Sequence, residues 1–175
     1  MRDRFAFGPA EYGQFFAFIG FCYAISQSLV TKVLFHTCGG DQPAGRKRIF
    51  AGAVAVIGIG RYLAFGATHL TAMYAYYAAV VLATGVVSTV FATDTSFVTE
   101  PGQAGAFFGL VATLESASGM LGPLLGGALA KIHPTLAPMV ATSMLSTVIL
   151  GLVWFGYEPI VLSRLPVASK KPKTD

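Results

Sequence analysis

Glu115 is the side chain best placed to do chemistry, because it lies in the middle of a long apolar run, residues 105–127. A charged carboxylate at the centre of a bilayer costs at least about 2.5–3.5 kcal/mol, so it faces a cavity, pairs with a partner or is protonated. A surrounding of low dielectric constant favours the protonated form, which suits a group that binds and releases a proton. The sequence leaves two alternatives: Glu115 carries protons, or it is a protonated carboxyl that hydrogen-bonds a neighbouring helix.

Three further polar side chains lie in apolar runs and are candidates for a proton or substrate pathway: Gln27, Asp94 and Arg61. Gln27 could hydrogen-bond a substrate or another helix. Asp94 lies near the end of its run, where a solvated carboxylate or a helix cap is the alternative to a proton site. Arg61 also lies near a surface, and its long side chain could either reach the interface or pair with an acid in the membrane.

The run around Glu115 also contains a series of small residues and one proline. Many of them are three or four positions apart and therefore share one helix face. Pro123 lacks an amide proton and is expected to bend the helix, so this motif predicts either a hinge or a surface for tight packing. Its members are Gly105, Gly109, Ser118, Gly119, Gly122, Pro123, Gly126 and Gly127.

The composition of the chain indicates that membrane helices position these residues. Of 175 residues, 54% are hydrophobic and only 11% are charged, whereas soluble domains carry about 25% charged residues. A helix needs about 20 mainly apolar residues to cross a bilayer. Five runs qualify, and we predict an all-α domain over residues 1–162 followed by a basic tail, 163–175. The runs are 12–34, 49–67, 71–93, 105–129 and 134–157.

The distribution of basic residues predicts an orientation with the N-terminus outside and the C-terminus inside. In this orientation eight of the twelve Lys and Arg residues lie inside, including the cluster at 46–48 and the lysines of the tail. The membrane could be the plasma membrane or that of an organelle.

Other classes of function find little support in the sequence. The three histidines, His36, His69 and His133, fall near the ends of different runs, so we expect no metal site or cofactor. The two cysteines do not form a disulfide framework, and the modest net charge of +4 does not indicate a nucleic-acid partner. No nucleotide-binding loop, nucleophile elbow or catalytic carboxylate pair is present, which argues against an enzyme.

Several segments resemble a known family of carriers. The order Gly109, Ser118, Gly122-Pro123, Gly126-Gly127 is similar to the antiporter signature of drug:proton antiporters in the major facilitator superfamily, with serine in place of one glycine. Residues 2–34 resemble the external loop and eighth helix of tetracycline-resistance efflux proteins and of eukaryotic tetracycline-transporter-like proteins, where a central glutamine matches Gln27. Residues 38–50 resemble the basic loop before the ninth helix, and residues 99–109 the start of the eleventh.

This resemblance implies the C-terminal half of a carrier without its first helix, that is, helices eight to twelve. The implied activity is antiport of a drug or small organic solute against protons by alternating access, in which the Gly-Pro segment seals and hinges. The N-terminal half, a necessary partner besides the lipid bilayer, is missing, so we expect the sequence to be incomplete. The alternative is a membrane interaction or regulatory protein derived from a transporter.

Overall fold

The computed structural model describes residues 7–40, 42–100, 102–133 and 136–157, and all regular structure in them is helical. Five helical segments are long and apolar enough to cross a membrane, which confirms the predicted architecture. The first is composed of α2 (Pro9–Ile25), the π-helical turn η1 (Ser26–Val30) and α3 (Thr31–Cys38). The others are α4 (Pro43–Gly66), α5 (Leu70–Val98), α6 (Ala104–Ile132) and α7 (Leu136–Tyr157). The predicted tail, 163–175, lies outside the described residues.

Local sequence signals explain where the first two spans begin and end. Pro9 and Pro43 occupy the first turns of α2 and α4, where a missing amide proton costs nothing and the fixed φ angle suits a helix. At the other end of the first span, Gly39 ends α3 in the left-handed region, with a φ of 67°, which glycine adopts without steric penalty.

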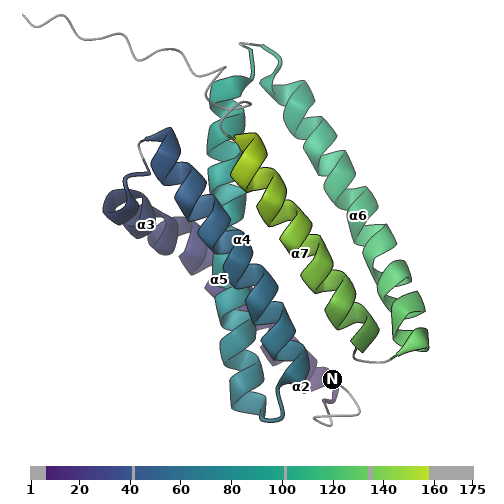
Figure 1. The fold of residues 1–175 in the computed structure, drawn as a ribbon. Coiled ribbons are helices and arrows are strands. Elements are labelled where there is room, and N and C mark those ends of the chain that lie inside the picture. Colours follow the sequence, from purple (N-terminus) through teal and green to yellow (C-terminus); the bar gives the residue numbers. More distant parts are fainter. Residues whose placement is uncertain (1–6, 41, 101, 134–135, 158–175) are drawn as a thin grey trace, which may run out of the picture.

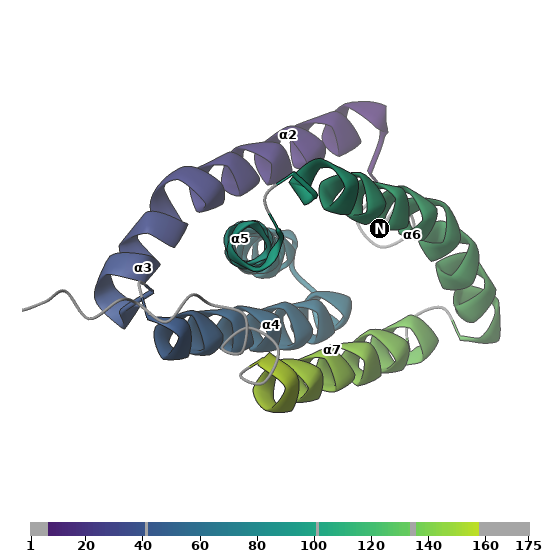
Figure 2. The ribbon, with the colours of Figure 1, turned by 90° about the horizontal axis from the view of Figure 1, so that it is seen from above.

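Helix α5 lies at the centre of the bundle, and the other helices surround it (Figure 2). Helix α4 packs between α5 and α7, while α2 and η1 pack along α5. Helix α6 stands at the edge beside α7 (Figure 1).

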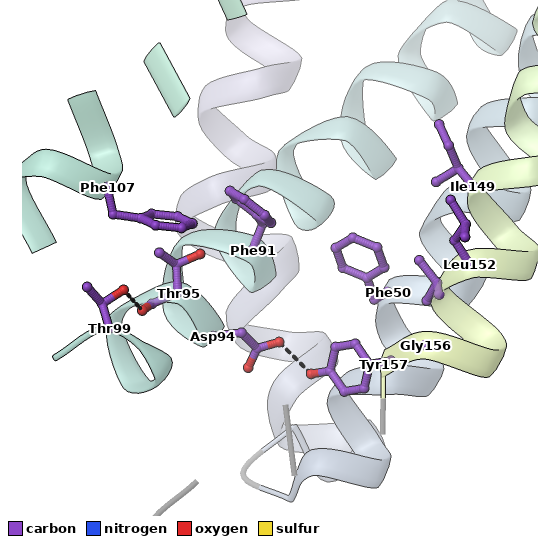
Figure 3. A pocket seen from close by; sticks show the side chains of 11 residues that line it. Phe50, Phe91, Asp94, Thr95, Thr99, Phe107, Ile149, Leu152, Gly156 and Tyr157 are labelled. Carbon is purple, nitrogen blue, oxygen red and sulfur yellow. Dashed lines mark hydrogen bonds between the residues drawn. The ribbon is translucent and has the colours of Figure 1, made fainter. Parts of the chain in front are cut away.

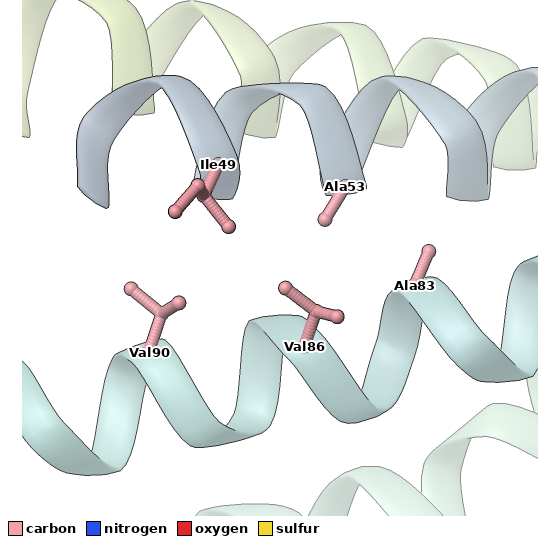
Figure 4. Packing of buried hydrophobic residues seen from close by; sticks show 5 residues of the cluster. All are labelled: Ile49, Ala53, Ala83, Val86 and Val90. Carbon is pink, nitrogen blue, oxygen red and sulfur yellow. The ribbon is translucent and has the colours of Figure 1, made fainter. Parts of the chain in front are cut away.

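The main apolar contact joins α4 to α5. Ile49 and Ala53 of α4 face Ala83, Val86 and Val90 of α5 (Figure 4), and all five are buried. A second buried cluster lies near the start of α5, where Phe7, Phe15, Ala67 and Met73 pack together. Outside these clusters many large apolar side chains are exposed, as expected of helices that meet lipid chains rather than water.

The π-helical turn inside the first span was not predicted from the sequence. Both the amide N–H and the Oγ1 hydroxyl of Thr31 donate to the carbonyl of Ser26, the latter at 2.9 Å. The fully buried Ser26 hydroxyl in turn donates to the carbonyl of Leu82 in α5. Gly85 makes this approach possible, because a Cβ at that position would lie 2.5 Å from the Ser26 Oγ atom.

Helix α6, which carries the small-residue motif, has no buried residue. A Cβ added to any of its glycines would meet no atom within 4 Å, so the small residues face no other described helix closely. The helical segment continues through Pro123, where the sequence predicts a bend or hinge. The motif is thus uncovered within the described part of the chain.

Candidate functional site

A buried ion pair joins α4 to α5 at one end of the bundle. The guanidinium Nε of Arg46 lies 2.8 Å from Oδ1 of Asp94. The two residues are only 6% and 7% exposed. The solvated carboxylate or helix cap that the sequence offered as the alternative to a proton site at Asp94 is wrong, because the acid is buried and pairs with a cation.

Further contacts extend the pair into a cluster. The Tyr157 hydroxyl at the end of α7 donates to Oδ2 of Asp94 (Figure 3), so the two carboxylate oxygens have different partners. Arg46 also donates to the carbonyl of Gly40 at 3.2 Å, and its guanidinium carbon lies 5.7 Å from the centre of the Phe97 ring. Three helices and one loop therefore meet at Arg46 and Asp94, which form a pair without net charge.

Chain direction explains why these residues meet. Short connections make α4 and α5 antiparallel, so the first turns of α4 lie beside the last turns of α5. Helix α7 ends at the same level, which brings Tyr157 to Asp94. In the sequence, Arg46 stands out only as part of a basic cluster. Two opposite charges at the same end of adjacent antiparallel helices were the signal that could have identified the pair.

An apolar cavity of about 440 Å³ adjoins the cluster (Figure 3). Its walls come from four helices, and three phenylalanines from three of them, Phe50, Phe91 and Phe107, dominate it. Asp94 and Tyr157 lie together at one end, and Thr95 and Thr99 line the cavity from the same end of α5. Cavities of this size and composition hold small organic molecules in many proteins.

The other predicted pathway residues lie apart from this cluster. Gln27 is exposed and belongs to the π-helical turn, Arg61 is exposed in the later half of α4, and Glu115 is exposed on α6. The structure therefore does not bring the four predicted side chains together. None of these three has an ion-pair or hydrogen-bond partner among residues 7–40, 42–100, 102–133 and 136–157.

The described residues contain no group of three metal-ligating side chains that could hold an ion. Comparisons with protein families, curated proteins and solved structures found no match to this chain. The geometry of the helices and their polar groups is therefore the basis for a functional proposal.

Proposed function

We propose that this chain is part of a secondary active transporter, a drug or organic-solute:proton antiporter that works by alternating access. The observation that carries the proposal is the position of Glu115, an exposed carboxylate within a long apolar helix. In a bilayer such a group cannot remain charged against lipid chains without a cost of several kcal/mol. It therefore needs a proton, a cavity or a partner, and exchange among these states is what a proton-coupled carrier requires.

The uncovered face of α6 supports a larger assembly. Its glycines and Ser118 present a flat surface that meets no described helix, and small residues of this kind allow close contact between membrane helices. We propose that the second half of the carrier covers this face and forms the other wall of a solute pathway. In this assembly Glu115 lies at the boundary between the two halves.

The contacts within the chain are consistent with a moving α6. Helices α4, α5 and α7 are joined by the ion pair and the Tyr157 hydroxyl, whereas α6 packs mainly on α7. We infer that the three joined helices move as one body and that α6 shifts against them.

The orientation proposed for the carrier places the Arg46 end inside the cell, as the distribution of basic residues favours.

The experiment is proton release from proteoliposomes that contain this chain together with the remaining helices of the carrier and a pH-sensitive dye. A gradient of a permanently charged aromatic cation, which crosses the bilayer only through the carrier, should drive proton movement in the wild type and not in Glu115→Gln. Ser116→Ala, one position away, is the matched control and should retain coupling. Unchanged coupling in Glu115→Gln would remove this residue from the proton pathway.

The requirement for a second half has its own test. The 175-residue chain reconstituted by itself should show no proton-coupled transport, because one wall of the pathway is absent. The genomic sequence upstream of Met1 should encode seven more spans in the same reading frame. Transport by the chain alone would contradict the proposal, and a true start codon with matching transcripts would favour an interaction or regulatory protein.

A further inference from the structure

A groove of about 700 Å³ lies between α3, α4 and α5, on a different side of α4 from the aromatic cavity. One end is polar and is formed by Thr37, Cys38 and Arg48. The remainder is apolar, with Leu34 and Val56 among the residues that line it. The groove thus combines a cationic end near the helix termini with an apolar channel that leads toward the middle of the bundle.

The three consecutive basic residues of α4 have three different environments. Arg46 pairs with Asp94, and the Lys47 ammonium lies 5.0 Å from the centre of the Trp154 ring on α7. Arg48 is exposed and, among the residues that the structure describes, has no ion-pair or hydrogen-bond partner. Successive side chains on a helix point about 100° apart, which explains the separation. Of these three residues, Arg48 is therefore the one that no described side chain pairs with, and it is suited to receive an external anion.

The floor of the groove is formed by the packed faces of α4 and α5. Ile49 and Ala53 face Ala83 and Val86 across this contact (Figure 4), and all four are buried, whereas Gly52 and Val56 beside them on α4 are exposed to the groove. A Cβ at Gly52 would also meet no atom within 4 Å. From Arg48 to Val56 the groove follows α4 for two turns, about 12 Å at 1.5 Å per residue.

We propose that this groove binds an anionic phospholipid, with the phosphate at the Arg48 guanidinium and one acyl chain along the apolar floor. Arginine matches phosphate geometry with paired hydrogen bonds, and basic pockets between membrane helices are suited to anionic headgroups. A zwitterionic lipid such as phosphatidylcholine also carries a phosphate, but its choline cation balances that charge and its attraction to Arg48 is therefore weaker. A small soluble anion would leave the apolar floor uncovered, so the two parts together specify an amphiphile with a negative head.

The test is native mass spectrometry of the full chain, titrated with phosphatidylglycerol and phosphatidylcholine that carry the same acyl chains. The wild type should bind phosphatidylglycerol more tightly. Arg48→Gln should weaken phosphatidylglycerol binding about fivefold, the effect of one cation near an anionic headgroup. It should weaken phosphatidylcholine binding less, because the choline cation of that lipid already balances its phosphate. Gly52→Leu should weaken binding of both lipids, because its side chain occupies the path of the acyl chain.

Two matched variants serve as controls. Lys131→Gln removes an exposed cation at the end of α6, and Gly20→Leu adds the same side chain at a glycine of α2 that also has no neighbour within 4 Å. Both should bind the two lipids as the wild type does. Equal loss in Arg48→Gln and Lys131→Gln would show that attraction is diffuse, and wild-type binding by both Arg48→Gln and Gly52→Leu would also overturn the proposal.

Discussion

Arg46 and Asp94 come from different helices, yet Nε and Oδ1 lie 2.8 Å apart and both side chains are buried. The ion pair therefore holds the first turns of α4 against the last turns of α5. Desolvation of two charges offsets much of their attraction, so the pair as a whole adds little net stability. The loss of one partner has a different result, because the other charge stays buried without compensation.

We expect Asp94→Asn to lower the free energy of unfolding by about 3–5 kcal/mol, since Arg46 keeps its charge and loses its counter-ion. Unfolding in mixed micelles with increasing SDS, followed by circular dichroism, measures this change. The double variant Arg46→Met, Asp94→Leu should recover most of this loss, because apolar side chains replace both charges and only the acceptor of the Tyr157 hydroxyl is still missing. A double variant as unstable as Asp94→Asn would contradict this account of the ion pair.

Removal of the Tyr157 hydroxyl should lower the free energy of unfolding by less than removal of the Asp94 charge does. Tyr157→Phe removes the donor to Oδ2 of Asp94 and should lower the free energy of unfolding by about 1–3 kcal/mol. Tyr62→Phe is the control, because Tyr62 is half exposed and should be insensitive to the change. Equal stability of Tyr157→Phe and the wild type would mean that α7 is not held through this bond.

The sequence predicted the five spans because their apolar length is a simple and strong signal, and the described helices differ from the predicted ranges mainly at their ends. The ends differ because polar first turns, such as Arg46 and Lys47 in α4, are helical without being apolar. The π-helical turn lies against α5 through Ser26 and Gly85, and a contact between such distant positions cannot be predicted from a local sequence pattern.

The contacts of the candidate site could not be predicted from the sequence for the same reason. Asp94 was identified from the sequence as an acid in an apolar run, but its environment depends on which cation the packing brings to it. Burial of Arg46 could not be distinguished from exposure of Arg48, because both belong to one basic cluster and differ only in the direction they face around α4. Charge pattern predicts the level of a residue in the membrane, whereas packing determines its partner.

Gly85→Ala tests the close contact between α5 and the π-helical turn. The new Cβ would lie 2.6 Å from the Cβ of Ser26, which cannot move away without losing its hydrogen bond to Leu82. We expect a loss of about 1–3 kcal/mol in the free energy of unfolding, as for other overpacked sites.

A compensating variant separates this contact from a general effect of alanine. Ser26→Gly combined with Gly85→Ala should recover part of the loss, because the clashing atoms are removed. Gly20→Ala, at a glycine with no neighbour within 4 Å, should not destabilise the protein. If the single variant Gly85→Ala is as stable as Gly20→Ala, the two segments are not in close contact.

The proposed orientation can be tested with a native thiol. Cys38 is exposed at the end of α3, beside the basic cluster of α4, whereas Cys22 is buried. Basic residues favour the inner side of the membrane, so this end of the bundle should face the cytoplasm. A membrane-impermeant maleimide should therefore label Cys38 only after the cells are permeabilised, with Cys38→Ser as the control that assigns the signal. Labelling of Cys38 on intact cells at the same rate would reverse the orientation and place Arg48 at the outer leaflet.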